Sequence, residues 1–286
     1  MKQMKLFSRR LILVLFAVMT LSCSGKRVLI IEDPYFDHFA SSDVRFYHIR
    51  KRVLFLTSGL RIETVNPVEN PSSIKEAEEA LNSGRYKGFI NFYQYHQAIQ
   101  VPPNVRTVLI GGSRELDYPE ITQIISSGTE ALSLVGQELL NLWNNEGIVP
   151  LTVFWEKQSA GEQEKKALLG PWGDNPVLND NILVLNENTA DVQLKIESFF
   201  SRYDFQTENY IILAYSPEVY KEFFRSLPEG EDIPAIYVLP DNPVLPESAY
   251  GIITEDYTGQ LKAALSAVKS GSKGKKIKVE NKFIRK

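Results

Sequence analysis

Short apolar runs alternate with helix-like segments along nearly the whole chain. Residues 27–31 (RVLII) are typical, because the run is short, β-branched and bounded by polar residues, as in a buried parallel strand. The segment 129–145 is the longest amphipathic one, and Gly147 ends it. Strands are expected at residues 27–31, 61–65, 87–92, 105–110, 151–155, 182–185, 210–214, 235–239, 251–254 and, in the tail, 278–283. Helices are expected at residues 42–58, 72–83, 129–145, 161–169, 190–203, 217–226 and 258–269.

This alternation of strands and helices predicts parallel sheets covered by helices on both faces. The pattern divides near residues 121–127 into two series of similar length. We therefore expect an α/β fold with two doubly wound parallel-sheet lobes. In such sheets ligands bind beyond the carboxyl ends of the strands, and the ends of two lobes can line one cleft.

The amino terminus has the pattern of a secretory signal. Four basic residues within the first ten positions precede an apolar run at 11–21, and Cys23, the only cysteine, follows. The run is too short to span a bilayer, which takes about 20 residues. The boundary resembles the lipobox of bacterial lipoproteins, which implies a signal peptide at 1–22, a lipid on Cys23 and a tether at 23–26. The alternative is an ordinary secreted or singly anchored protein whose cysteine lies there by chance.

Charge and cysteine content narrow the class of protein. The whole chain has 32 basic and 35 acidic residues, and the leader holds four of the basic ones. The mature chain therefore has 28 basic against 35 acidic residues, a net charge of −7. This balance argues against nucleic acid as a partner, because phosphate binding needs a basic surface. No cysteine remains in the mature chain for a disulfide or a thiolate metal site.

Four strings, together with the alternating layout, resemble the type I periplasmic substrate-binding proteins, the ribose- and galactose-binding group that shares its fold with the ligand domains of LacI-type repressors. One is Asp33-Pro34-Tyr35-Phe36 after the first strand, similar to a loop whose two aromatic residues pack on a bound sugar. The others are the helix from Gly128 to Gly147, the string 237–241 (YVLPD) and the string 251–256 (GIITED) followed by Gly259.

The resemblance implies three crossings between the lobes. It places one lobe at residues 27–124 and 256–276, and the other at 125–255 and 277–286. It further implies a monomer, anchored by lipid on the extracytoplasmic (periplasmic) face of the cell membrane. Such a protein captures a small solute in the cleft between the lobes and delivers it to an ABC-type permease.

The chain departs from the sugar-binding pattern at several positions. An Asp-Arg or Asp pair usually ends the fourth strand, whereas this chain reads Gly111-Gly112-Ser113-Arg114. An Asn-Asp pair usually follows the strand at 210–214, whereas Tyr215-Ser216 follows it here. The aromatic positions are kept or enriched, and rings stack on flat or C–H-rich ligands. A nucleoside-like ring compound is therefore expected at least as much as a sugar.

The candidate ligand-binding residues each have a structural alternative. The rings of Tyr35 and Phe36 either clamp the ligand or plug the lobe edge. Asp33 would accept a hydrogen bond from a hydroxyl or amine of the ligand. Arg114 either pairs with a ligand anion or forms an ion pair on a solvated loop. The full set of candidates is Asp33, Tyr35, Phe36, Tyr93, Ser113, Arg114, Tyr215, Asp241, Asn242 and Glu255, of which Asp241 and Asn242 could equally serve the hinge.

Catalysis and metal binding find no support in the sequence. The three histidines form no HxH, HExxH or Cys/His cluster, so no metal site is expected. A Gly-x-Ser-x-Gly elbow, a Walker loop and a Gly-x-Gly-x-x-Gly fingerprint are absent, so neither an enzyme nor a bound cofactor is expected. The alternative function is a sensor or structural lipoprotein that keeps the fold without transport. A hydrolase would need a nucleophile–base pair that the sequence does not reveal.

Overall fold

The computed structural model describes most of the chain from residue 26 onward. It covers residues 26–43, 46–68, 72–111, 119–155, 162–185, 192–205, 208–214, 233–238 and 249–286. The chain divides into two compact units. Unit 1 contains the described residues through Ser126 together with Asp256–Val279, and unit 2 contains Ser127–Glu255 together with Glu280–Lys286.

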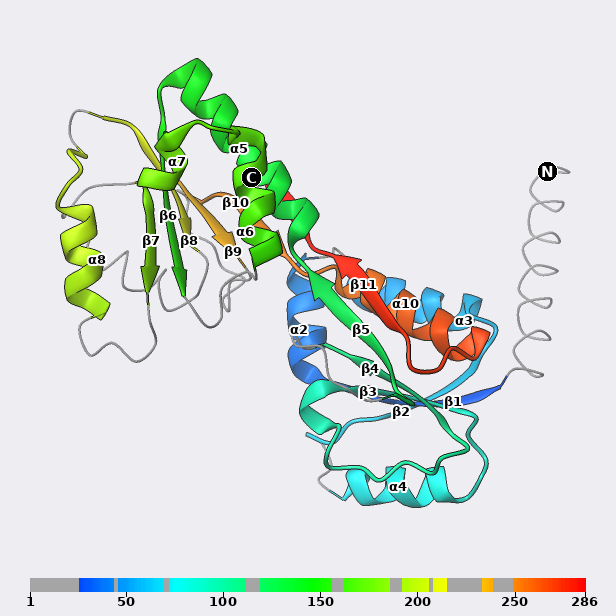
Figure 1. The fold of residues 1–286 in the computed structure, drawn as a ribbon. Helices are drawn as coiled ribbons and strands as arrows, with labels where there is room; N and C mark the ends of the chain where they lie inside the picture. The colour runs from blue at the N-terminus through cyan, green and yellow to red at the C-terminus, as the bar shows by residue number, and fades with distance from the viewer. Residues whose placement is uncertain are drawn as a thin grey trace, which may run out of the picture. The chain divides into compact units, whose positions relative to one another are not determined.

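Unit 1 is built on a six-stranded sheet in the order β11-β5-β4-β3-β1-β2 (Figure 1). Its strands are β1 (Arg27–Ile31), β2 (Arg61–Val65), β3 (Gly88–Phe92), β4 (Arg106–Ile110), β5 (Thr122–Ser127) and β11 (Lys276–Glu280). The pairs from β2 through β1, β3 and β4 to β5 are all parallel. Its helices are α2 (Pro34–Asp43), α3 (Tyr47–Thr57), α4 (Ser73–Asn82) and α10 (Tyr257–Ser270), with the 3₁₀ turn η1 (Tyr93–Tyr95).

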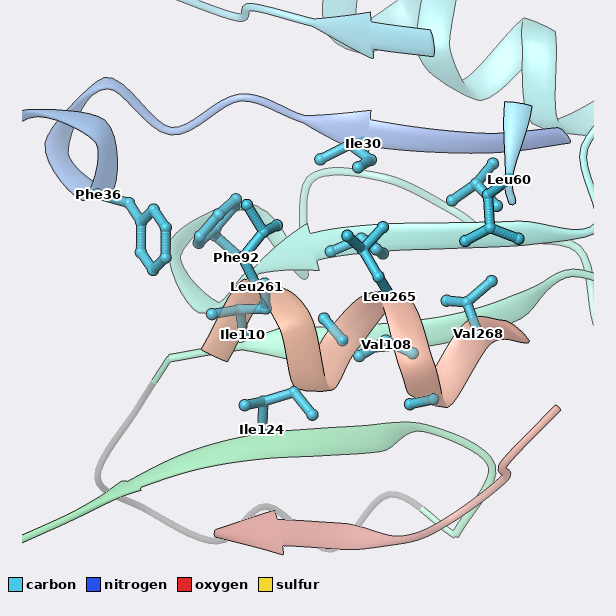
Figure 2. Packing of buried hydrophobic residues seen from close by; sticks show 14 residues of the cluster. Ile30, Phe36, Leu60, Phe92, Val108, Ile110, Ile124, Leu261, Leu265 and Val268 are labelled. Atoms are coloured by element: carbon cyan, nitrogen blue, oxygen red, sulfur yellow. The ribbon is translucent and has the colours of Figure 1, made fainter. Parts of the chain in front are cut away.

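The two faces of the unit 1 sheet carry separate cores, because side chains alternate along each strand. Val28 and Ile30 of β1 belong to the cluster beneath α10, which Figure 2 shows with Leu261, Leu265 and Val268. Leu29 and Ile31 lie in the opposite cluster with Ala77 and Leu81 of α4. Both faces are therefore covered by helices, which explains why β1 reads as a continuous apolar run.

Unit 2 repeats this plan with the order β12-β10-β9-β8-β6-β7. Its strands are β6 (Val149–Trp155), β7 (Ile182–Leu185), β8 (Tyr210–Ala214), β9 (Ala235–Val238), β10 (Ala249–Thr254) and β12 (Lys282–Arg285). Four of its five pairs are parallel, and β12 is antiparallel to β10. Its helices are α5 (Thr129–Glu146), α6 (Glu162–Leu169), α7 (Pro176–Asp180) and α8 (Val192–Phe200), with the 3₁₀ turn η2 (Gly170–Trp172).

The sequence of helix α5 has the hydrophobic pattern of a helix that faces the core. Its buried residues recur every three to four positions and face the cluster that contains Ile211 and Leu213 of β8. It ends at Gly147, which adopts φ 67° and donates its backbone N–H to the carbonyls of the last turn. A left-handed glycine at this position is the common way to end a helix.

The structure corrects three expectations about elements. The helix expected at 42–58 begins only at Tyr47, after Phe46 with a left-handed φ of 63°, and an additional helix, α2, begins at Pro34. Residues 122–127 form strand β5 rather than a bare division between the lobes. The single tail strand expected at 278–283 is two strands in different sheets, β11 and β12. The helix expected at 217–226 lies outside the described residues.

Candidate functional site

The strand order of each unit creates a topological switch point. In unit 1, β1 lies between β2 and β3, so the chain continues from β1 in one direction and from β3 in the other. Ligands of open α/β sheets bind outside the carboxyl ends of the strands at such a point. The residues that directly follow β1 and β3 are therefore the candidate site of unit 1. The corresponding point of unit 2 lies between β6 and β8, and the residues that follow both strands are outside the described part of the chain.

Asp33 lies two residues after the end of β1 and immediately before α2. Its carboxylate oxygen Oδ1 accepts a hydrogen bond from the Tyr35 amide at 3.0 Å, and its carbonyl accepts one from the Asp37 amide at 2.9 Å. This is the geometry of an N-cap, with Pro34 at the first helical position. The Gln94 side chain also donates to the Asp33 carboxylate and joins the ends of β1 and β3.

Burial raises the pKa of the Asp33 carboxyl above its ordinary value of 3.8. The donors from Tyr35, Phe36 and Gln94 act in the opposite direction, because they stabilise the charged form. Asp33 is therefore already an acceptor within unit 1. A ligand hydroxyl or amine would use only the acceptor capacity that these donors leave.

Tyr35 and Phe36 are neighbours in sequence but differ in environment. The Tyr35 side chain is 63% exposed, whereas Phe36 is 7% exposed. The Phe36 ring lies 4.8 Å from the Phe92 ring and 5.0 Å edge-on from the Tyr257 ring, measured between centroids. Figure 2 shows Phe36 turned toward Phe92 and Leu261 in the unit 1 core. The two residues, expected in a loop, lie in the first turn of α2, and only Tyr35 offers most of its ring to solvent.

Tyr93 lies at the end of β3, across the switch point from Asp33 and Tyr35. Its ring is exposed and stacks on His96, with centroids 5.3 Å apart and planes 18° from parallel. The His96 Nδ1 lies 2.8 Å from the Tyr93 carbonyl, which fixes the short turn. The buried Asn91 supports the same segment, because its side-chain amide donates to the Tyr95 carbonyl.

A charged cluster that the sequence did not reveal lies beside Asp33. The Lys51 ammonium is 2.7 Å from Asp37 and 3.2 Å from Glu32, and the Tyr47 hydroxyl donates to Asp37. These groups line a pocket together with Asp33, with a free volume of about 10 Å³, about the space of one water molecule. This pocket is too small for a sugar or a nucleobase.

The remaining predicted residues divide into two groups. Glu255 is half-buried directly after β10, next to Asp256, whose carboxylate accepts from the Gly259 amide and caps α10. Ser113, Arg114, Tyr215, Asp241, Asn242 and Cys23 lie outside the described residues. The structure thus brings Asp33, Tyr35 and Tyr93 to one edge of unit 1, places Phe36 mainly in its core, and leaves the ligand-binding roles as predictions.

Within the described ranges, no three or more His, Cys, Asp or Glu residues converge as metal ligands would. In the same part of the chain, no helix combines the length and apolar character that a membrane span requires. The described edge has the exposed rings of Tyr35 and Tyr93 for stacking and the polar side chains of Asp33 and Gln94 for hydrogen bonding.

Comparison with known proteins places the fold. No family model and no curated protein matches the sequence. Among solved structures, a LacI transcriptional regulator from a Rhodococcus species has a TM-score of 0.52 at 14% identity, over 91% of this chain and 96% of that one. A LacI-family regulatory protein from Chloroflexus aggregans has a TM-score of 0.51 at 15% identity, over 91% and 97% of the two chains. A solute-binding protein of an ABC transporter system from Aeropyrum pernix K1 has a TM-score of 0.49 at 12% identity, over 91% and 76%.

These likenesses concern the fold alone, because the identities are low. The two six-stranded, mostly parallel sheets match the type I periplasmic binding protein fold, which the LacI regulator ligand domains share. The predicted fold class is confirmed.

Proposed function

We propose that this protein is a lipid-anchored, extracytoplasmic solute-binding protein that captures a small polar ligand containing a ring, either a sugar or a nucleoside-like compound. One observation carries the proposal. The exposed rings of Tyr35 and Tyr93 stand on either side of the unit 1 switch point, where folds of this type bind their ligands. Binding, rather than bond making or breaking, is the activity proposed.

The side chains at this edge favour a ligand with an apolar ring face and polar substituents. Tyrosine rings stack on flat or C–H-rich surfaces, and a tyrosine also carries a polar hydroxyl at the edge of its ring. Asp33 and Gln94, already hydrogen-bonded to each other, supply acceptor and donor groups beside those rings. A purely apolar ligand would displace the water that hydrogen-bonds to these polar groups and would offer them no hydrogen bond in its place.

The sequence supports the place of action and the partner. The basic head, the short apolar run and Cys23 fit a signal peptide followed by lipid attachment, which puts the mature chain on the outer face of the cell membrane. A binding protein held there fits delivery of its solute to an ABC-type permease. The acidic mature chain does not favour a nucleic-acid partner.

A sensor or structural lipoprotein is the second candidate, and a specific observation favours it. Phe36 is packed in the core, Asp33 caps α2, and the pocket beside them has room for about one water molecule. Side chains at this edge already pack or form hydrogen bonds inside unit 1. This arrangement is typical of a protein that has kept the fold and lost solute uptake.

Thermal unfolding in the presence of candidate solutes tests the proposal. The chain from residue 24 would be screened against sugars, nucleosides, purine and pyrimidine bases, and amino acids. A ligand at 100 times its dissociation constant adds about 2.7 kcal/mol to the free energy of unfolding. A raised melting temperature with one chemical class supports solute binding. No shift with any class, for folded protein freed of carried-over ligand by unfolding and refolding, supports the second candidate.

A matched pair of variants then locates the site for any compound that binds. Tyr35→Ala removes an exposed ring at the switch point, and we expect it to weaken affinity at least about tenfold. Leu194→Ala removes an equally exposed side chain from α8 and should leave affinity unchanged. Equal affinities for both variants would show that the ligand does not stack on Tyr35.

A further inference from the structure

Helix α3 carries an apolar stripe on its solvent side. Ile49, Val53 and Leu56 are 60%, 52% and 60% exposed, and their spacing of four and three residues places them on one face of the helix. The opposite face is already used, since Tyr47 is buried and Phe55 packs against the unit 1 core. The helix is therefore apolar on two sides, and the core accounts for only one of them.

Basic side chains border the stripe. Arg50 and Arg52 follow and precede stripe residues by one position, so at about 100° per residue they lie on its two flanks. Both are exposed, and the eleven residues of α3 include no acidic one. The neighbouring Lys51 differs, because it points to the inner side and pairs with Asp37. A stripe flanked by cations on both sides is the arrangement of helices that lie on anionic membranes.

The carboxyl end of α3 lies next to the place where the chain enters unit 1. The Lys269 ammonium donates to the Ser58 carbonyl at 2.7 Å, and the Lys26 ammonium donates to the Lys269 carbonyl at 3.2 Å. The Lys26 carbonyl in turn accepts from the Arg61 amide. The start of β1, the end of α3 and the end of α10 thus meet at one corner of unit 1.

This corner is basic although the mature chain is acidic. Lys26, Arg61 and Lys269 are all exposed there and add to the two arginines of α3. Attraction to an anionic surface acts over about 10 Å at moderate ionic strength, so a local basic patch can orient a chain of net negative charge. Lys26 lies at this corner and follows Cys23 by three positions in the sequence, so an anchor at Cys23 would hold the chain close to it.

We propose that the α3 surface, consisting of the stripe Ile49, Val53 and Leu56 and its flanking arginines, docks on an anionic lipid bilayer. The arginines and the basic corner contact phosphate headgroups, and the three apolar side chains enter the boundary between headgroups and acyl chains. This contact does not require a lipid on Cys23. Where such a lipid anchors the chain, the contact strengthens the anchoring and orients the chain on the membrane. The inference is independent of the solute-binding proposal, because it uses none of the residues at the switch point.

Vesicle flotation tests the docking. The chain of residues 24–286 is used, because it holds every described element and lacks the apolar leader that would itself bind lipid. At low salt, we expect it to float with vesicles of phosphatidylglycerol and phosphatidylcholine in equal parts, and to float far less with phosphatidylcholine alone. The triple variant Ile49→Ser/Val53→Ser/Leu56→Ser should lower the partition coefficient at least about tenfold. Arg50→Gln/Arg52→Gln should lower binding to the anionic vesicles only.

A matched control and three contrary outcomes keep the test decisive. Leu134→Ser/Leu194→Ser removes two equally exposed apolar side chains from unit 2, and it should float like the unmodified chain. Thermal melts confirm that each variant is folded. Failure of the unmodified chain to float, or equal flotation of the triple variant, overturns the proposal. A dimer in analytical ultracentrifugation that the triple variant abolishes assigns the stripe to a second copy of the chain, and also overturns it.

Discussion

The Lys51 ammonium of α3 lies 2.7 Å from the Asp37 carboxylate of α2. The same ammonium reaches Glu32 after β1 at 3.2 Å, and the Tyr47 hydroxyl donates to the other Asp37 oxygen at 3.0 Å. Burial raises the pKa of the Tyr47 hydroxyl, so it remains a neutral donor. This network joins α3, α2 and the end of β1, and so fixes the first turn of α2 from which Tyr35 extends.

Lys51→Met should destabilise the protein by roughly 2 kcal/mol, because it leaves two partly buried carboxylates without their cation. Chemical unfolding at neutral pH measures the loss. Lys75→Met is the control, since Lys75 pairs with Glu79 at 3.9 Å on the open surface of α4 and should cost less than about 0.5 kcal/mol. Similar losses of stability for both variants would mean that the Lys51 network stabilises the protein no more than an ordinary surface ion pair does.

Alanine substitutions at Tyr35 and Phe36 should differ widely in their effect on stability. Phe36→Ala empties a core position between Phe92 and Tyr257 and should cost about 3–5 kcal/mol. Tyr35→Ala removes an exposed ring and should change the free energy of unfolding by less than about 0.5 kcal/mol. Urea unfolding compares the two. A small loss of stability for Phe36→Ala would contradict the core position of this ring and would mean that it lies at the solvent-exposed edge.

Local patterns predicted most of the secondary structure. β7 and β8 have the predicted bounds, because apolar runs between polar turns are strong local signals. The order of the strands was not predictable in the same way, since it depends on contacts between distant segments. The tail shows this best: a single short strand was predicted at residues 278–283, yet the tail forms β11 and β12, which lie on either side of Asn281 and pair with different sheets.

The candidate site was predictable only in part, for a similar reason. Its position after β1 follows from the alternating pattern, and Tyr35 and Tyr93 lie at the switch point. Phe36 was expected beside Tyr35, but a helix turns successive side chains by about 100°, so one faces water and the other the core. The pairing of Lys51 with Glu32 and Asp37 joins residues 19 and 14 positions apart, respectively, and no local spacing signals it.

Gly136→Ala should destabilise unit 2 although alanine favours helices. An added Cβ would lie 2.2 Å from the Leu168 carbonyl oxygen, a backbone atom, so α5 and α6 would have to separate. The neighbouring hydrogen bond from the Trp172 indole to the Gly136 carbonyl, 2.9 Å long, would be strained as well. The steric clash should cost more than the roughly 1 kcal/mol that alanine gains in a helix interior. We expect the free energy of unfolding to fall by about 1–3 kcal/mol in total.

Gly170→Ala is the matched control for this close approach. Gly170 lies in η2 with no atom within 4 Å of a built Cβ, so the substitution should change stability by less than about 0.5 kcal/mol. Thermal melts of both variants give the comparison. An unchanged melting temperature for Gly136→Ala would show that α5 and α6 do not pack as closely as the structure has them.

The pH dependence of stability should report on the burial of Asp33. Because its folded-state pKa is raised above 3.8, the folded protein holds this proton more tightly than the unfolded chain does. The stability from the protonated carboxyl is present below pH 3.8 and is lost as the pH rises through the raised pKa. Asp33→Asn keeps a side chain that caps helices equally well and removes the charge. Its free energy of unfolding, relative to the unmodified protein, should therefore increase as the pH rises from below 3.8 toward neutral.

Urea unfolding at a series of pH values measures this difference, and Asp174→Asn controls for removing one carboxylate from an exposed position. A difference that falls with rising pH would mean that the donors from Tyr35, Phe36 and Gln94 outweigh burial, and that Asp33 is held as a stable carboxylate. That outcome would also change the chemistry offered to a ligand. A fixed carboxylate favours hydroxyl and amine donors, whereas a protonated carboxyl can itself donate a hydrogen bond to the ligand.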